Sequence, residues 1–304
     1  MLNLEGLHLR AALFRSIRSF FHNENFLEVD TPVRQPVLIP ECNIVPIRAG
    51  SLFLQTSPEQ CMKRLLARGC RRIFQICPCF RANEQGRQHL EEFTMLEWYR
   101  VDSDYQDLMA DCEKLLRHVF LELSGPRQTR QPIFGSRLGT MFLDEPWERL
   151  SVGESFEKFS PVTLKTAMLE NRFDEIIVEH IEPHLGISRP TFLYDYPAEC
   201  ASLACLKPGD ECLAERFELY IDGLELANGF SELTNPDEQR RRFLKELELL
   251  QPEHGEMMLP ERFLEELGGI EKAAGIAFGL DRLLMLLLSE ESIDEVVSFS
   301  AADW

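Results

Sequence analysis

Two glutamates on either side of a tight turn are the first residues whose spacing suggests chemistry. In RFELYIDGLELANGFSEL (216–233), Asp222-Gly223 separates two alternating runs, and this dipeptide is the strongest short signal for a two-residue hairpin turn. The turn predicts the pairs Ile221 with Leu224, Tyr220 with Glu225, and Glu218 with Ala227. Glu218 and Glu225 are then diagonal neighbours on one face, roughly 7–8 Å apart at Cα. They favour a divalent metal, with Mg²⁺ carried by phosphates the best candidate; the alternative is two solvated acids on an exposed face.

The opposite face of this hairpin is apolar and is predicted to join the core. Its residues are Phe217, Leu219, Ile221, Leu224 and Leu226. Beyond Ala227 the alternation changes, because Asn228, Phe230 and Glu232 have the opposite parity from Glu225. A β-bulge at Gly229 would bring them to the face of the two glutamates.

A second stretch with chemical character runs from Arg72 to Val101. The sequence predicts a strand over 73–80, an eleven-residue loop that opens with Arg81 and carries Glu84 and His89, and a second strand. In the second strand one face is predicted to hold Phe93, Met95, Glu97 and Tyr99. A simple hairpin needs neither so charged a loop nor a carboxylate and a phenol beside its aromatics. The alternative is a solvated loop between ordinary strands.

The third stretch is GIAFGLDRLLMLLL (275–288), which passes from strand to helix at Gly279. Asp281 suits the first turn of a helix because it favours the dipole. Arg282 is unfavourable there unless an anion occupies the same place, and Gly279 would let such a ligand approach the backbone.

The charge balance limits the kinds of partner. With 32 basic and 51 acidic residues the net charge is −19, which argues against non-specific binding of nucleic acid. An anionic partner therefore needs a local basic cluster, and we identify one candidate between residues 63 and 72. It comprises Lys63, Arg64, Arg68, Arg71 and Arg72. The alternative is a solvated helix face.

The composition of the 304 residues is that of an ordinary soluble globular protein, with 44% hydrophobic and 27% charged residues. There is no apolar run long enough for a membrane span and no secretory signal, so we expect a cytoplasmic protein. The nine cysteines are odd in number and irregularly spaced, which indicates thiols in a reducing compartment. With no repeat and no clear linker, one domain spanning 1–304 is the simplest interpretation.

The elements that must position these residues alternate between helices and strands. We expect helices at 8–25, 58–67, 103–123, 236–250, 260–267 and 281–288, with a helical insert at 150–190 and a poorly patterned segment at 124–145. Ser57 is predicted to cap the second helix, with Pro58 at its first position. Further strands are expected at 26–33, 51–57, 191–199, 201–206, 275–280 and 296–300.

The order of these pieces resembles the three motifs of class II aminoacyl-tRNA synthetases. The segments TSPE (56–59), HLEEFTMLEWY (89–99), YPAE (196–199), ELANGFSEL (225–233) and GLDRLLML (279–286) are similar to lysyl-tRNA synthetases in particular. Two features differ: the chain begins one helix before the first motif, without the anticodon-binding barrel, and Ala227 stands where the synthetases usually have glycine. Both features resemble the truncated paralogues that attach lysine to elongation factor P. The resemblance implies an α+β fold built on an antiparallel sheet flanked by helices.

The resemblance also implies roles for individual residues. It places Arg81 at the ATP α-phosphate, His89 near the β- and γ-phosphates, Phe93 against adenine, and Arg282 on the other face of adenine or near the γ-phosphate. Leu219 and Gly279 would border the nucleotide, and Glu218 and Glu225 would hold its Mg²⁺. Glu59 would take the substrate's backbone-side ammonium and Asn228 its carboxylate, and Ser57 and Glu225 would also line the substrate site. Glu97, Tyr99 and Glu232 would close on the distal ammonium and so select lysine.

Several alternatives stay open at this point. The glutamate that reads adenine in the family falls on Asn83, while Glu84 follows one residue later. Ala227 would narrow the pocket and favour (R)-β-lysine over α-lysine. The acceptor is expected to be elongation factor P, docked on the 63–72 cluster, and the alternatives are tRNA or a non-catalytic amino-acid sensor. A homodimer is expected, with Pro32 and the 8–25 helix near the interface.

Overall fold

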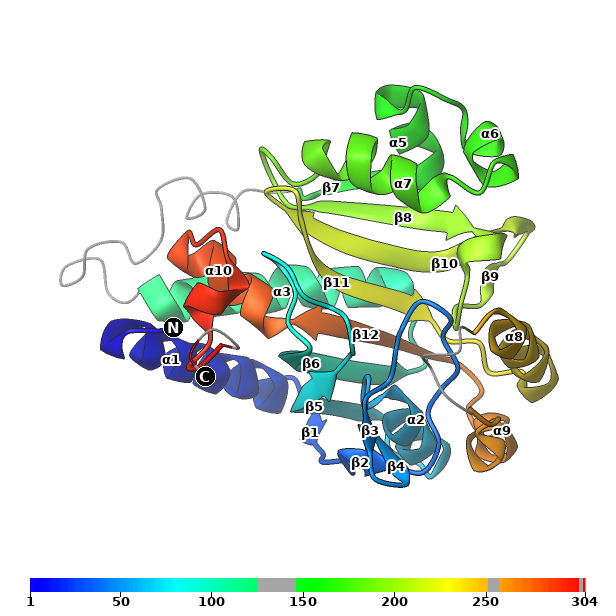
Figure 1. Cartoon of the computed structure of the whole chain (residues 1–304), viewed down its shortest axis with the longest axis horizontal. Helices are drawn as coiled ribbons and strands as arrows, with labels where there is room; N and C mark the ends of the chain where they lie inside the picture. The colour runs from blue at the N-terminus through cyan, green and yellow to red at the C-terminus, as the bar shows by residue number, and fades with distance from the viewer. Residues whose placement is uncertain (125–145, 251–256, 301–302, 304) are drawn as a thin grey trace.

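A long mixed sheet forms the centre of the computed structural model, which describes residues 1–124, 146–250, 257–300 and 303 (Figure 1). Within these residues its strands follow the order β1-β5-β6-β12-β11-β10-β8-β7, with the short β9 paired to β10. The bounds are β1 Leu27–Glu28, β5 Arg72–Phe80, β6 Glu92–Val101, β12 Ala273–Gly279, β11 Leu224–Ser231, β10 Asp210–Ile221, β8 Thr191–Pro197, β7 Glu148–Ser151 and β9 Leu206–Lys207. Neighbours from β5 to β8 are antiparallel, whereas β1 and β7 join the two edges in parallel. The predicted α+β class is confirmed, with parallel strands at the edges of an antiparallel centre.

One face of the sheet packs on α1 (Leu4–Asn23), α3 (Tyr105–Ser124) and α10 (Leu280–Leu288), which enclose the largest apolar cluster. Phe21 of α1 is fully buried and stacks on Phe74 of β5 with ring centroids 4.6 Å apart. Just after α1, the predicted helix stop Asn25 has a left-handed φ of 60°. Because α10 follows β12 directly, its first turn lies at the edge of the opposite face.

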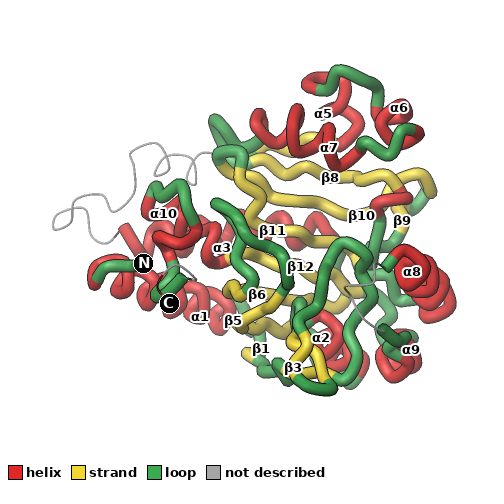
Figure 2. The backbone as a smooth tube through the Cα atoms, viewed as in Figure 1, coloured by secondary structure: helices red, strands yellow, loops and turns green. Residues whose placement is uncertain are grey.

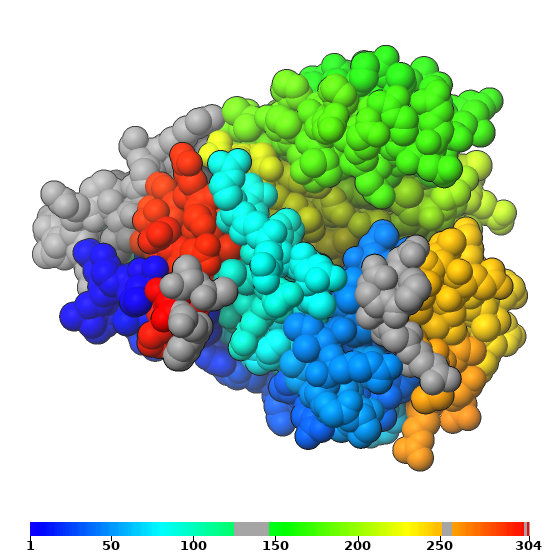
Figure 3. Space-filling model, viewed as in Figure 1, coloured from blue at the N-terminus to red at the C-terminus, as the bar shows by residue number. Residues whose placement is uncertain are grey.

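Two smaller groups of helices border that opposite face (Figure 2). At one end, α5 (Val152–Phe159), α6 (Leu164–Leu169), α7 (Phe173–Ile176) and the turns Ile177–Ile181 and Glu182–His184 form the predicted helical insert and pack on β8. At the other end lie α2 (Glu59–Ala67), α8 (Pro236–Leu249) and α9 (Glu261–Leu267). A small sheet of β2 (Arg34–Gln35), β4 (Leu52–Leu54) and β3 (Arg48–Ala49) lies beside α2. Figure 3 shows β10 and β11 recessed between these groups and the β5–β6 loop.

Four local predictions differ from the structure. Segment 201–206 is mostly a turn rather than a strand: the Ala204 N–H donates to the Ala201 carbonyl, Ala204 forms an isolated bridge to Glu232, and Leu206 alone belongs to a strand, β9. Segment 296–300 is not a strand either; a 3₁₀ turn, Ile293–Val296, occupies its start. The strands expected at 26–33 and 51–57 shorten to β1 and β4.

The cap of α2 is also different. Pro58 occupies the N-cap without any side-chain cap bond, so the prediction for Ser57 is wrong. Residues 125–145, most of the segment expected to be poorly patterned, lie outside the described residues. Within the described part, no helix is both long and apolar enough to span a membrane.

Candidate active site

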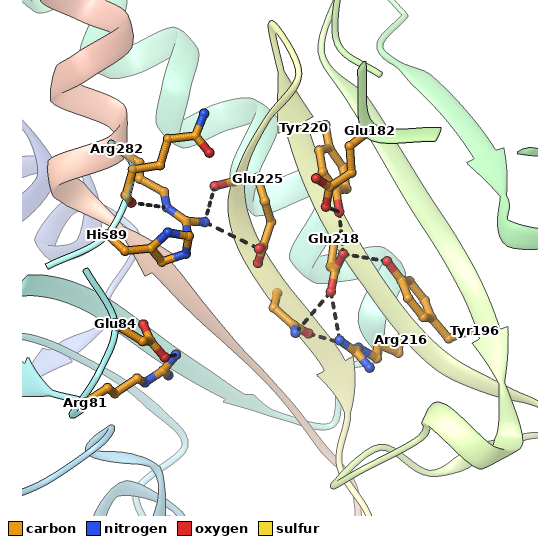
Figure 4. Close-up of polar contacts among 12 residues, drawn as sticks. Arg81, Glu84, His89, Glu182, Tyr196, Arg216, Glu218, Tyr220, Glu225 and Arg282 are labelled. Carbon is orange, nitrogen blue, oxygen red and sulfur yellow. Dashed lines mark hydrogen bonds and ion pairs between the residues drawn. The ribbon is translucent and has the colours of Figure 1, made fainter. Parts of the chain in front are cut away.

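The loop between β5 and β6 meets the start of α10 and the start of β11 at one side of the recess (Figure 4). Arg282 of α10 connects these segments. Its Nη1 donates to the Glu225 carbonyl of β11 at 2.8 Å, and its Nε donates to the Gln88 carbonyl of the loop at 3.3 Å. Its Nη2 lies 2.6 Å from His89 Nε2. Burial and the positive charge of Arg282 lower the pKa of His89, which favours the neutral imidazole. An arginine and a neutral histidine thus face the same space, as suits phosphate oxygens.

Arg81 and Glu84 form a second charged pair in this loop. The guanidinium of Arg81 lies over the ring of Phe93, 5.3 Å from its centroid, and 3.7 Å from the Glu84 carboxylate. The intervening Asn83 has a left-handed φ of 66°, is exposed, and donates its N–H to Glu91. Asparagine tolerates this conformation, and the turn it makes directs Glu84 back toward Arg81. Of Asn83 and Glu84, Glu84 is therefore the one whose side chain pairs with Arg81.

The acidic hairpin has the predicted turn but a different register. Ile221 pairs with Leu224 and Tyr220 with Glu225, as expected, but Leu219 then pairs with Ala227 because Leu226 is an extra residue. The bulge therefore lies at Leu226 and the prediction of Gly229 is wrong. Gly229 pairs regularly with Phe217, and a Cβ there would lie 2.7 Å from the Phe217 ring.

The bulge changes which side chains face the recess. Leu219 and Ala227 both belong to the large apolar cluster under the helices. A nucleotide could therefore contact Leu219 only through its backbone, and Ala227 does not narrow a pocket on the other face. Glu218 and Asn228 now pair, and they share the recessed face with Tyr220 and Glu225.

Glu218 is held by three strong donors and one weaker donor (Figure 4). The hydroxyls of Tyr196 and Tyr220 donate to it at 2.6 and 2.7 Å, and Arg216 Nη2 donates at 2.7 Å. Asn228 Nδ2 lies at 3.4 Å, and Arg216 Nε donates to the Asn228 amide oxygen at 3.3 Å. The position of Glu218 is thus fixed before any ligand arrives.

A third carboxyl, Glu182, lies near this pair. Its Oε1 is 3.0 Å from the Tyr220 hydroxyl, which has one proton and is closer to Glu218. Burial raises the pKa of Glu182, whereas the hydrogen bond that its Oε1 accepts from Tyr220 acts to lower it.

Glu225 is the second acid of the predicted metal site. Burial and the neighbouring Glu218 raise its pKa, opposed by Arg282, whose Nη1 is 3.4 Å from Glu225 Oε2. A cation between the two glutamates would relieve this repulsion, so the residues fit Mg²⁺. Over the described ranges, no set of three or more His, Cys, Asp or Glu side chains has metal-binding geometry.

At the α2 end of the recess three charged side chains meet in the interior. The Lys63 ammonium is 2.5 Å from Glu59 Oε1, one helical turn before it, and contacts Glu232 Oε2. The side chains of Lys63 and Glu232 are each 1% exposed. Burial acts to lower the Lys63 pKa, but Glu232 and Glu59 outweigh it and the pKa is raised. Lys63 is therefore a buried ion-pair partner, and its assignment to a surface docking cluster is wrong.

The other members of that cluster are already paired. Arg64 and Arg68 both donate to Glu266, Arg71 pairs with Asp102, and Arg72 donates to the Glu24 carbonyl. Glu266 and Asp102 offset part of the charge of Arg64, Arg68 and Arg71, whereas a carbonyl oxygen carries no full charge to offset that of Arg72, so this face carries less free positive charge than the sequence suggests.

Glu97 and Tyr99 of β6 lie beside this ion-pair group. The Tyr99 hydroxyl donates to Glu97 Oε1 at 2.6 Å, and both side chains are about 2% exposed. Burial and Glu59 raise the Glu97 pKa well above its usual range, and burial with Glu59 raises that of Glu232 to about 8 against the opposing effect of Lys63. Glu97 Oε2 and Glu232 Oε1 accept no hydrogen bond, whereas Glu232 Oε2 is in contact with the Lys63 ammonium. Such buried acceptors are costly unless a ligand satisfies them.

Gly275 on β12 makes room for this arrangement. A Cβ there would lie 2.5 Å from Glu232 Oε1 and closer still to the Tyr99 ring. Four predicted residues thus gather here, namely Glu59, Glu97, Tyr99 and Glu232, while Ser57 is half-buried at the head of α2. Gly279 is the N-cap of α10 without a side-chain cap. Asp281 accepts from Arg10 and from the Thr94 N–H, so it links α1 and β6 to this turn.

Sequence reasoning missed Arg216, Tyr196, Glu182, Gly275 and the true place of Lys63. Arg216 and Tyr220 could have been found from their parity, since they flank Glu218 at two residues on the same strand face. Lys63 could have been found from its i+4 spacing to Glu59 on one helix.

A family model described as tRNA synthetases class II (D, K and N) matches residues 3–303. Three bacterial relatives are named elongation factor P–(R)-β-lysine ligase. They come from Vibrio atlanticus (37% identical, over 97% of this chain and 95% of the relative), Vibrio cholerae (38%, 98% and 95%) and Photobacterium profundum (38%, 98% and 96%).

Proposed function

Because the chain belongs to the class II tRNA synthetase family (D, K and N) and to its branch of elongation factor P–(R)-β-lysine ligases, we propose that it activates a lysine-type amino acid with ATP and transfers it to elongation factor P. The reaction makes an acyl-adenylate, and a lysine amine of the acceptor protein then receives the acyl group. The names of the relatives support the substrate and the acceptor.

The observation that carries this proposal is the set of unsatisfied carboxylate oxygens on Glu97 and Glu232. A buried ammonium needs charged partners and hydrogen bonds, and these oxygens with the Tyr99 hydroxyl supply both. A neutral side chain in the same place would leave them unpaired. The pocket therefore selects amino acids that carry a distal ammonium over amino acids with a neutral side chain.

In the first half-reaction an oxygen of the substrate carboxylate attacks the α-phosphorus of ATP and pyrophosphate leaves. No protein nucleophile is needed, because catalysis is positioning and charge stabilisation. We assign Arg81 to the α-phosphate and His89 to the β- and γ-phosphates. Phe93 and Glu84 are assigned to the face and the amino group of adenine.

Arg282 is placed to bind either the second face of adenine or the γ-phosphate, both of which suit a planar cation. Glu218 and Glu225 would hold Mg²⁺ on the nucleotide, and the metal when bound would neutralise phosphate charge. Arg216, Tyr196 and Tyr220 keep Glu218 oriented for that role.

In the second half-reaction the neutral ε-amine of the acceptor lysine attacks the acyl carbon. The acyl–phosphate bond breaks, AMP leaves with the electron pair, and the amine loses a proton as the amide forms. At the substrate's other end, Glu59 is assigned to the backbone-side ammonium and Asn228, tied to Arg216, to the carboxylate.

Four further features belong to this proposal. We propose (R)-β-lysine over α-lysine because the relatives' names specify it. Residues 1–304 are proposed to act as one catalytic domain, since one sheet uses strands from both ends of the chain. A homodimer and a cytoplasmic location are also proposed.

The test is ATP–pyrophosphate exchange with α-lysine and with (R)-β-lysine, followed by mass spectrometry of elongation factor P incubated with the enzyme. We expect exchange with a preference for (R)-β-lysine, and a mass increase on the acceptor protein. Glu97→Gln should abolish most exchange while leaving ATP binding intact. Absence of exchange with either amino acid would overturn the enzymatic proposal, and labelling of tRNA instead of protein would overturn the acceptor.

A further inference from the structure

Lys63 is a buried cation inside a pocket that is built to receive cations. Its Nζ contacts Glu59 on its own helix and Glu232 beyond β11, and it lies 5.2 Å from the centroid of the Phe230 ring. The side chain is 1% exposed, so solvent does not screen these contacts. A positive charge at this point opposes the entry of another ammonium unless the local carboxylates outnumber it.

The local carboxylates do outnumber it. A bound substrate ammonium favours the ionised carboxylates, and in that state Glu59, Glu97 and Glu232 carry three negative charges, of which Lys63 offsets one. The count covers these four side chains alone; Glu41, whose pKa burial raises to about 7, and Arg81, which pairs with Glu84, are left out of it. The excess is two negative charges, and lysine-type amino acids carry two ammonium groups.

The unsatisfied oxygens agree with this balance. Glu97 Oε2 and Glu232 Oε1 are buried and accept no hydrogen bond, although Lys63 already contacts the other oxygen of Glu232. Lys63 thus leaves acceptors free for a ligand rather than using all of them. A role limited to joining α2 to the segment after β11 would not require an excess of buried acid.

We propose that Lys63 is a specificity-determining residue, an internal ammonium that matches the charge of the three carboxylates to a substrate with two ammonium groups. The proposal rests on the proposed function, since it concerns how that site selects its amino acid. It predicts that affinity for a substrate with two ammonium groups depends on the net charge of the pocket as well as on the individual contacts between carboxylates and ammonium groups.

The experiment compares Glu232→Gln with the double variant Lys63→Met/Glu232→Gln. Glu232→Gln leaves the pocket with one excess negative charge. The double variant also removes the positive charge of Lys63, so the excess returns to two negative charges. Dissociation constants for lysine and for norleucine, which lacks the distal ammonium, are measured by calorimetry in the presence of a non-hydrolysable ATP analogue. Affinity for the analogue and the melting temperature report whether each variant is folded.

We expect Glu232→Gln to lose at least about tenfold in its preference for lysine over norleucine, and the double variant to regain about tenfold. The double variant removes Lys63 together with one of its two carboxylate partners, so it remains measurable even if Lys63→Met alone does not fold. A double variant that melts like the wild type yet prefers lysine no more than Glu232→Gln does would overturn the proposal. A wild-type protein that binds no diammonium amino acid would instead show that the proposed function itself is wrong.

Discussion

Replacing Gly275 with alanine tests the amino-acid pocket with a single added methyl group. The new Cβ would lie 2.5 Å from Glu232 Oε1 and closer still to Cδ1 and Cε1 of Tyr99. Ordinary contacts between such atoms are about 3.5–4 Å, so the Tyr99 ring must move by on the order of 1 Å. Its hydroxyl is bound to Glu97 at 2.6 Å, and a shift of that size removes the bond or moves Glu97 as well.

The size of the effect follows from this displacement. A misplacement of about 1 Å in a positioning group costs about 100-fold in rate, or about 2.7 kcal/mol. Overpacking of a buried site costs about 1–3 kcal/mol of folding stability. We therefore expect Gly275→Ala to fold, to bind ATP as the wild type does, and to lose about 100-fold in kcat/KM for the amino acid.

The assay is ATP–pyrophosphate exchange with each substrate varied in turn. Gly153→Ala is the matched control, because a Cβ at this position in α5 meets no atom within 4 Å. It should keep both KM values and gain up to about 1 kcal/mol of stability. Wild-type kinetics for lysine in Gly275→Ala would refute the placement of the distal ammonium between Tyr99 and Glu232.

Three further predictions concern the nucleotide side and the buried acids. Tyr220→Phe removes a donor to Glu218, and the Mg²⁺ concentration at half-maximal exchange should rise about tenfold; an unchanged requirement would argue against Glu218 as a ligand. Arg282→Lys loses the planar cation, so KM for ATP should rise about tenfold with KM for lysine unchanged, and equal rises in both would contradict the assignment. The Glu232 carboxyl, with a pKa raised to about 8, holds its proton more tightly in the folded chain than in the unfolded one. The stability that this raised pKa contributes is present below about pH 4.5 and is lost as pH rises through 8. The melting temperature of the free protein should therefore fall between about pH 5 and 8, and it should fall less in Glu232→Gln. Parallel pH profiles of the two proteins would contradict this.

The alternation of side chains predicted much of the site. On β6 the split between the face of Phe93, Glu97 and Tyr99 and the face of Leu96 and Trp98 is confirmed by their separate apolar clusters. Strand period is a local property, and one buried face is enough to fix it. Local sequence signals also predicted three further elements, namely the eleven-residue loop, the Asp222-Gly223 turn and the helix after Gly279.

What could not be predicted depends on partners distant in sequence. The basic run at 63–72 contains both surface arginines and the buried Lys63, and only the position of Glu232 separates them. The run at 201–206 has the composition of a strand, but a turn between Ala201 and Ala204 takes up its first part and leaves Leu206 alone in β9. The position of the bulge was ambiguous because Gly229 offered a plausible site, whereas its missing side chain makes room for Phe217 instead.

The bulge at Leu226 determines where this hairpin can tolerate a change of length during evolution. Leu226 and Ala227 both join the apolar cluster under the helices, so Glu225 and Asn228 face the recess from the same strand although three positions separate them. Loss of the Leu226 codon would leave the pairs Tyr220 with Glu225 and Glu218 with Asn228 in place, and would cost the core one buried leucine, about 2–5 kcal/mol. Loss of a codon after Asn228 would instead turn every later residue of the strand to its other face. Loss of a residue at the bulge thus lowers the stability of the fold, whereas loss of a residue beyond it changes which side chains line the pocket.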